Sequence, residues 1–237
     1  MSPTHRALPM AALLITASAA HADGLYGIGA LGWSGPNADA EPYGNNIAVD
    51  PDFPGAFDVD DGSVGVIGLG TVLANGLRIE GRFAVRDSDI NARRIGTGAR
   101  AGEEYILDGS VQSTSFTLET LYEFAGGGTF TPYVKAGIGV SDNDFDARLG
   151  GAGVAGFDAV DGTVDGFYDA YPDGSSTEFS WTLGLGGSLA LGPNSVLFGE
   201  VQYLELGQVQ TAQDAFTDGF GVDAAVTEVL VGLRLSF

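Results

Sequence analysis

The chain has 237 residues, with 38 glycines, no cysteine, and 31 acidic against 10 basic residues, for a formal net charge of −21. Without cysteine, the protein has neither disulfides nor thiolate metal ligands. Both histidines lie in the first 22 residues, which excludes catalysis or metal binding through histidine in the rest of the chain. So much glycine disfavours a helical protein, and no run approaches the roughly 18 apolar residues of a spanning helix.

Residues 1–22 are predicted to be a signal peptide. A weakly basic start precedes a short apolar run from Leu8 to Ala17, and Ala20-His21-Ala22 has the small residues of a cleavage site. The alternative, a buried first helix, is disfavoured because a glycine-rich strand pattern follows at once. We therefore expect an exported chain whose mature part begins at Asp23 and forms one domain over residues 23–237.

Eight segments show strand patterns, and each is long enough to cross a bilayer when tilted, for which about 9–11 residues suffice. They are residues 24–33, 63–73, 77–88, 112–124, 131–141, 177–191, 195–207 and 223–237. The short connections are 74–76, 125–130 and 192–194, and the long ones are 34–62, 89–111, 142–176 and 208–222. Because short and long alternate, an up-and-down sheet places the turns at one end and the loops at the other. The sequence predicts an all-β, eight-stranded antiparallel transmembrane barrel.

The last strand shows how the faces are used. Counted by twos, one face is apolar and ends in an aromatic residue, while the other carries charge and glycine: Phe237, Leu235, Leu233, Val231 and Val229 against Arg234, Gly232 and Glu228. A barrel strand needs an apolar face toward lipid and a polar face toward a closed interior. The third, fourth, sixth and seventh segments alternate likewise. The first two carry no charge, so their facing stays unassigned.

Aromatic and acidic residues sort along the predicted barrel. Aromatic side chains gather near the strand ends: Trp33, Phe179, Trp181 and Tyr203 toward the loops, and Tyr122, Phe124 and Phe237 toward the turns. Such girdles mark the two membrane interfaces. The long loops and their edges hold 24 of the 31 acidic residues. The negative charge is therefore expected at one end of the molecule.

The predicted inner faces hold a balanced set of charges. The basic members are Arg78, Arg82, Arg86, Lys135 and Arg234, and the acidic ones are Glu80, Glu119, Glu123, Glu200 and Glu228. An eight-stranded barrel is just wide enough for side chains to fill it, and an unpaired buried charge costs several kcal/mol. We therefore favour a static ion-paired interior over a gated or selective pore.

The chain resembles the small eight-stranded outer-membrane barrels, namely the OmpX and opacity-protein group and the barrel domain of OmpA. The resemblance covers residues 23–237 and rests on the final strand ending in Phe237, on TPYVKAGIGV (131–140) and on FGEVQYLELG (198–207). It implies an outer-membrane location among lipid and lipopolysaccharide, assembly through the C-terminal strand by the barrel-assembly machinery, and no nucleic-acid partner. The family often has Arg where Gln202 stands, so the interior pairing is expected to differ here.

Two acidic clusters in the predicted loops are candidates for Ca²⁺. They are Asp58, Asp60 and Asp61 in DVDDG, and Asp142, Asp144 and Asp146 in DNDFD. Alternating oxygen donors suit Ca²⁺, but neither cluster has the distal bidentate Glu of a full calcium loop. Solvated charge that keeps the loops apart is the favoured alternative, and no other cofactor is expected.

For function, the sequence favours a structural and surface-interaction role, with envelope support and adhesion through acidic loops that meet a cell-surface partner. A narrow porin for small solutes or ions is the first alternative. A secreted soluble barrel of the lipocalin type, with its apolar face inside, is the second, and the one-sided long loops and terminal Phe237 oppose it. An enzyme is not expected, because Glu119 and Glu123 lie roughly 13 Å apart along one strand and form no catalytic pair.

Overall fold

The computed structural model describes residues 24–44, 47–73, 77–124, 129–151, 167–212 and 219–237, with the side chains of 167–170 left aside. The predicted signal peptide falls outside these ranges, as do the short connections 74–76 and most of 125–130. Among the described residues, no helix is long and apolar enough to span a membrane.

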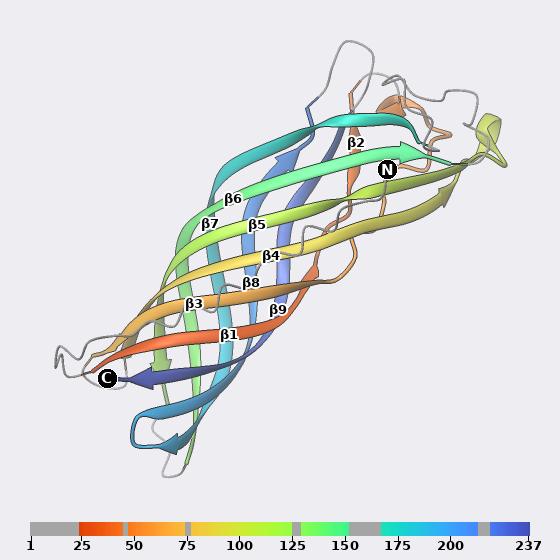
Figure 1. Cartoon of the computed structure of the whole chain (residues 1–237). Helices are drawn as coiled ribbons and strands as arrows, with labels where there is room; N and C mark the ends of the chain where they lie inside the picture. Colours follow the sequence, from red (N-terminus) through yellow and green to blue (C-terminus); the bar gives the residue numbers. More distant parts are fainter. Residues whose placement is uncertain (1–23, 45–46, 74–76, 125–128, 152–166, 213–218) are drawn as a thin grey trace.

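One closed antiparallel sheet makes up the described chain (Figure 1). Its strands are β1 (Leu25–Pro36), β2 (Glu41–Tyr43), β3 (Gly62–Val72), β4 (Leu77–Ile95), β5 (Glu104–Glu123), β6 (Phe130–Gly150), β7 (Phe167–Gly192), β8 (Ser195–Gln210) and β9 (Gly219–Ser236). The 3₁₀ turns η1 (Ile47–Val49) and η3 (Gly98–Arg100) lie between strands. Each long strand pairs with the next, and β9 closes the ring on β1 from Tyr26↔Ser236 to Pro36↔Val226. This confirms the predicted up-and-down barrel, to which β2 adds a short strand on β9.

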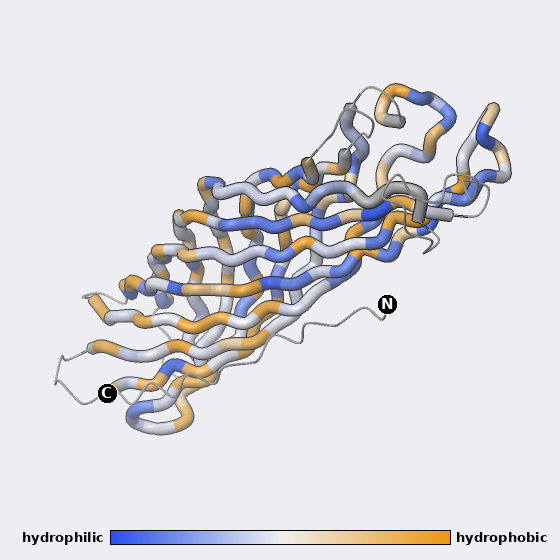
Figure 2. The backbone as a smooth tube through the Cα atoms, turned by 45° about the horizontal axis from the view of Figure 1, so that its top comes forward, coloured by the Kyte–Doolittle hydropathy of each residue, from blue (hydrophilic) through white to orange (hydrophobic). Residues whose placement is uncertain are grey.

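Near the turns, the barrel is apolar outside and polar inside. We call this part the membrane band, and its outward side chains include Leu31, Ile67, Phe83, Phe116, Ile138, Leu185, Val201 and Val231, each at least 43 % exposed. The two unassigned strands follow the same rule outside, but inside they are apolar, with Tyr26 and Ile28 of β1 and Val64 and Val66 of β3 buried. The alternation along each strand is visible in Figure 2 as apolar and polar residues in turn.

Beyond the membrane band, four strands continue much further than the sequence predicted. Strand β4 runs to Ile95 and β5 begins at Glu104, with unbroken pairing from Leu77↔Tyr122 to Ile95↔Glu104. Similarly, β6 runs to Gly150 and β7 begins at Phe167. The predicted loops 89–111 and 142–176 are therefore mostly strand, and this prediction was wrong. We call the continuation, β4 from Asp87, β5 to Thr114, β6 from Asp142 and β7 to Thr177, the outer extension.

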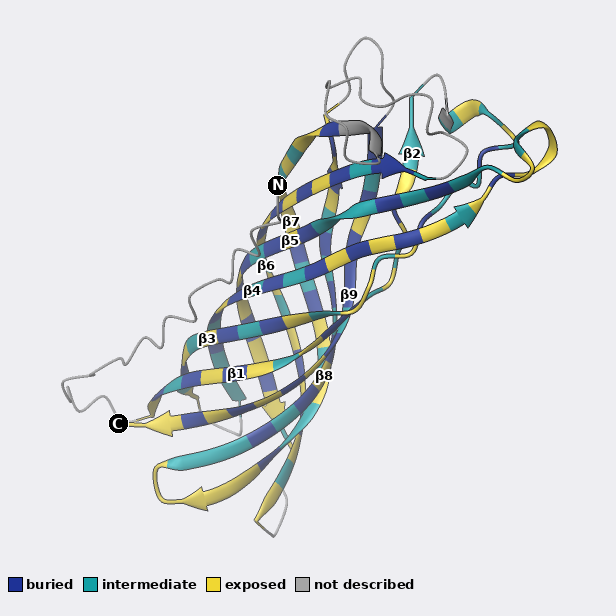
Figure 3. Cartoon of the chain, turned by 45° about the vertical axis from the view of Figure 1, so that its right-hand side comes forward, coloured by how far each residue is buried: buried dark blue, intermediate teal, exposed yellow. Residues whose placement is uncertain are grey.

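In the outer extension the two faces exchange polarity relative to the membrane band, while the same alternate positions of β6 keep pointing outward. Its outward residues on β6 are Asp142, Asp144 and Asp146, all exposed, while Phe145 and Leu149 point inward and are buried. Figure 3 shows buried residues alternating with intermediate or exposed ones along most of β4 and β5. The strands were predicted from an apolar outward face. This pattern ends where the outward side chains become polar, so the predicted strands are too short.

The first long connection folds into the mouth of the barrel. After β1, Ala40 exchanges both backbone hydrogen bonds with Phe57, at 2.8 and 2.9 Å. Phe53 and Phe57 are buried in an apolar core with residues of the six strands β4 to β9, namely Ile90, Tyr105, Leu107, Phe145, Leu149, Tyr171, Val209, Phe220 and Val222. Their rings contact Tyr105 and Phe220 at centroid distances of 4.8 and 5.7 Å. The part of the predicted long loop 34–62 that carries Phe53 and Phe57 thus closes the outer end.

Candidate functional site

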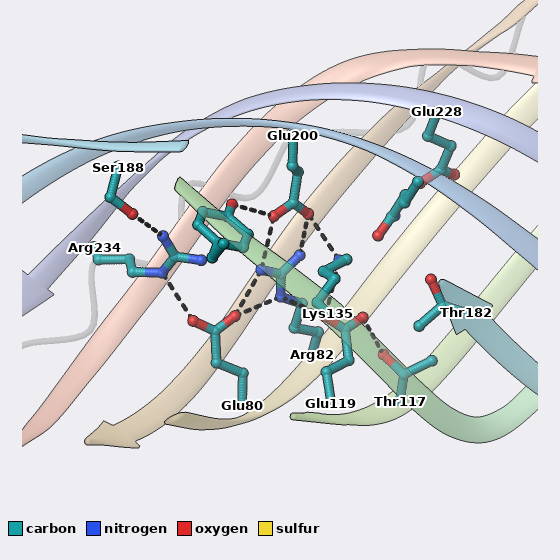
Figure 4. Close-up of polar contacts among 12 residues, drawn as sticks. Glu80, Arg82, Thr117, Glu119, Lys135, Thr182, Ser188, Glu200, Glu228 and Arg234 are labelled. Carbon is teal, nitrogen blue, oxygen red and sulfur yellow. Dashed lines mark hydrogen bonds and ion pairs between the residues drawn. The ribbon is translucent and has the colours of Figure 1, made fainter. Parts of the chain in front are cut away.

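Arg82 is the centre of an ion network inside the membrane band (Figure 4). Its guanidinium pairs with Glu80 at 2.6 Å, with Glu119 at 3.2 Å and with Glu200. Lys135 joins the same carboxylates, with its Nζ 2.9 Å from Glu119 and 2.8 Å from Glu200. All five side chains are buried. Two cations from β4 and β6 thus hold three carboxylates from β4, β5 and β8, which ties four strands together across the barrel.

Arg234 of β9 completes the charge balance of this network. Its Nε donates to Glu80 at 2.8 Å, and its guanidinium lies over the Phe198 ring, 4.1 Å from the centroid. Two tyrosines that the sequence analysis did not select donate to the same carboxylates: Tyr26 to Glu80 at 2.8 Å and Tyr133 to Glu200 at 2.7 Å. Tyr133 stands two residues before Lys135, so its inward facing could have been found from strand parity.

A second ion pair lies nearer the outer end. Arg86 pairs through Nε with one oxygen of Glu228 and donates to Ser115 at 2.7 Å. Gln202 donates its amide to the other oxygen of Glu228 at 2.6 Å. The carboxamide therefore supplies one neutral donor at the position where the resemblance leads one to expect an arginine, and the Arg86–Glu228 pair stays charge-balanced.

The last of the predicted pairs lies toward the turns. Arg78 meets Glu123 at 3.0 Å, and both side chains are 16 % exposed. The structure thus brings every predicted interior charge into an ion pair with another member of the set. Phe237, the predicted assembly signal, is 42 % exposed on the outer face of the barrel.

The interior is filled from the ion network to the apolar core. Between them lies a layer of small polar side chains that includes Ser113, Ser115 and Asn143, all buried. A cavity of about 20 Å³ beside Ser34 and Arg86 separates this layer from the core, and such a volume admits one water molecule. No aqueous path is expected through side chains packed in this way.

A polar cluster fixes the first connection to the β4–β5 tip. Arg100 donates to Asp50 at 2.7 Å, to Glu103 at 3.1 Å and to the Tyr105 hydroxyl at 2.8 Å. The Asp52 carboxylate accepts from the Ala99 amide at 2.9 Å. These contacts hold the segment that carries Phe53 and Phe57 over the barrel mouth.

The hydrogen bonds of this cluster shift its acid–base equilibria. The pKa of Asp50 is lowered by the backbone amide of Asp52 and by Arg100. The pKa of Glu103 is lowered by donation from Tyr105 and by Arg100. Burial and the bond to Glu103 raise the pKa of Tyr105 to about 12. Both carboxylates and the guanidinium therefore stay charged at neutral pH.

The two acidic clusters named for Ca²⁺ lie in different settings. Asp142, Asp144 and Asp146 alternate along the outer face of β6, where Thr177 donates to Asp142 at 3.1 Å and Ser110 to Asp146 at 2.6 Å. Asp58 pairs with Arg94 at 2.8 Å, and Asp60 and Asp61 are exposed just before β3. Among the described residues, no three acidic side chains converge as a metal site would need. Ca²⁺ binding stays a prediction that titration calorimetry can test.

A polar-lined barrel with an apolar outer band defines the class of outer-membrane β-barrel proteins. Residues 7–234 match the family described as outer membrane protein beta-barrel domain. The chain belongs to this family. The match begins inside the predicted signal peptide.

The chain is also similar to individual outer-membrane proteins. The chain is 23 % identical to the outer membrane protein PagN of Salmonella typhimurium, over 94 % of this chain and 93 % of PagN. Among solved structures, OprG of Pseudomonas aeruginosa matches with a TM-score of 0.60 at 14 % identity, over 90 % of this chain and 96 % of OprG. Ail, the attachment invasion locus protein of Yersinia pestis, matches at 12 % identity and a TM-score of 0.42, over 90 % of this chain and all of Ail. These structural similarities concern the fold alone.

Proposed function

We propose that this outer-membrane protein is a closed barrel that presents a rigid, acidic surface to partners outside the cell. The observation that carries the proposal is the way the interior is filled. The Arg82 network and the apolar core around Phe57 form two layers that close the barrel at different depths. The outer extension carries polar outward faces well beyond the apolar band. A shape that blocks transport and projects a folded surface suits contact better than conduction.

Surface contact is tested with proteoliposomes that carry the refolded protein. We expect them to attach to cultured cells or to a second bacterium more strongly than empty vesicles do. A variant with Asp89→Asn, Asp144→Asn and Asp146→Asn should attach less, because it removes charge from the outer face alone. The matched control, Gln112→Ala with Thr114→Ala, alters side chains on the same face without changing charge. Equal attachment of all vesicles, empty ones included, would refute the proposal.

The narrow porin is separated from this proposal by planar-bilayer recording. A barrel closed by both layers should show no steady single-channel current. A steady open conductance in the wild-type protein would favour the porin, and its loss on substituting an interior residue would place the path through the barrel.

We also propose that the chain reaches the outer membrane after removal of residues 1–22. The small residues at Ala20 and Ala22 support cleavage before Asp23. N-terminal sequencing of protein from outer-membrane fractions should begin at Asp23. A start at Met1 would contradict this.

A further inference from the structure

A polar groove lies on the outside of the barrel where β2 meets β9. The pairing of β1 with β9 stops at Pro36↔Val226 and resumes, in the same register, at Glu41↔Gly221. Between these points residues 38–40 leave β9, because Ala40 turns inward to bond with Phe57. The departure of this segment leaves a hollow beside β9. Strand β2, which borders it, lies near the outer end of the barrel (Figure 1).

Contacts between β2, β8 and β9 shape the groove. Gly221 supplies part of its wall, and a Cβ there would lie 3.0 Å from Cγ of Gln210. The Tyr43 hydroxyl donates to the Thr211 carbonyl, which holds β2 in place. Gln208 donates to Asp223 at 2.6 Å and orients that carboxylate. The hollow measures about 360 Å³, which is within the usual range of ligand pockets.

The groove is lined by acceptors. Three carboxylates, of Asp39, Glu41 and Asp223, and two carboxamides, of Gln208 and Gln210, surround it, and the described residues that line it include no lysine or arginine. The outer face of β6 is equally acidic, but its carboxylates alternate along a continuous strand. The groove therefore differs from the rest of the acidic surface by its concave shape and by its carboxamides.

We propose that this groove binds the guanidinium or ammonium group of a basic peptide segment on a partner protein. A planar guanidinium presents five donors that match carboxylate and amide oxygens. The surrounding negative charge attracts such a segment and repels polyanions. The inference rests on the proposed function in surface contact and gives the chemistry of the partner.

Titration calorimetry with a capped tetra-arginine peptide tests the site on refolded protein in nanodiscs. We expect saturable binding at one site, weakened about tenfold in Glu41→Gln with Asp223→Asn, because these charges contact the ligand. The control pair Asp142→Asn and Asp144→Asn removes the same charge elsewhere and should change the affinity by less than about twofold, since solvent and salt screen distant charges. Equal weakening by both pairs, or no saturable binding, would overturn the proposal.

A shape variant provides an independent test. Gly221→Ala leaves every charge in place and puts a methyl group into the groove, at the cost of moving the flexible Gln210 side chain. It should weaken the peptide without changing the heat-shift of the barrel on gels. Unchanged affinity in this variant, or binding of a neutral oligosaccharide in place of the peptide, would overturn the proposal. Because the peptide is a soluble ligand, its binding can succeed or fail independently of vesicle attachment to cells.

Discussion

The membrane band and the outer extension are built from the same strands, but the band buries polar side chains and the extension buries apolar ones. In the band, β6 exposes Ile138 and buries Lys135, whereas in the extension it exposes Asp144 and buries Phe145. Lipid accepts apolar side chains, so the band must place its polar groups inside and pair them. Water accepts carboxylates, so the extension can form an ordinary apolar core. The same strand can face lipid and then water because its outward face changes from apolar to polar near Asp142.

The largest expected effect comes from removing the centre of the ion network. Arg82→Ala leaves Glu80, Glu119 and Glu200 without their shared partner inside a low-dielectric interior. Breaking a buried pair in this way costs about 3–5 kcal/mol. Urea unfolding in detergent and the gel heat-shift measure this loss. Arg93→Ala is the control: its pair with Glu104 is exposed, and we expect a change within about 1 kcal/mol. Equal effects from both would show that the interior network does not stabilise the barrel.

A smaller and more local loss of stability is expected in the apolar core at the outer end of the barrel. Phe57→Ala empties a fully buried position in the apolar core, which costs about 3 kcal/mol. Hydrogen exchange should rise in residues 50–57 and at the β4–β5 tip, while the membrane band keeps its protection. Val49→Ala, on the same connection but 66 % exposed, should leave exchange unchanged. Global unfolding of Phe57→Ala would contradict the independence of the two regions.

Much of the membrane band could be predicted from the sequence, but the outer extension could not. The ring of eight strands, the interior charges and the lipid-facing residues of the charged strands follow from period-two alternation, because within the membrane band a charge such as Arg82 or Glu200 marks the inner face. The length of β4 to β7 could not be found in the same way, because Asp142 and Asp144 look like loop residues until Phe145 and Leu149 are known to face a core. The burial of Phe53 and Phe57 depends on contacts across the barrel mouth, which no local pattern encodes.

Acid should weaken the contacts that hold the first connection to the β4–β5 tip. The lowered pKa values of Asp50 and Glu103 mean that their contribution to stability is present above the unfolded pKa values, 3.8 and 4.5. It is lost as the pH falls below them and through the folded pKa values. Protection factors for residues 50–57 should therefore decrease below about pH 4.5. The double variant Asp50→Asn and Glu103→Gln should abolish this dependence, and a dependence that survives would assign it to other groups.

The smallest expected effect is a gain in stability. Partial desolvation and the neighbouring carboxylates of Asp173 and Asp108 raise the pKa of Asp146, so its charged form is less stable in the folded chain than in the unfolded chain. Asp146→Asn removes the repulsion and keeps an oxygen for the Ser110 hydroxyl. After solvent screening we expect stabilisation within about 0.5 kcal/mol, seen as a small rise in the urea midpoint. A clear decrease would mean that the carboxylate is needed for a contact that the amide cannot replace.

Spin labels along β6 test most directly whether its outward face passes from lipid to water. The chain has no cysteine, so single cysteines can be placed at Ile138, Val140, Asp144 and Asp146 without background, and the label's accessibility can be measured in nanodiscs. Labels at 138 and 140 should be reached by oxygen, which dissolves in lipid, and those at 144 and 146 by a water-soluble nickel chelate. Access of the nickel chelate to all four positions would contradict a membrane band that ends near Asp142.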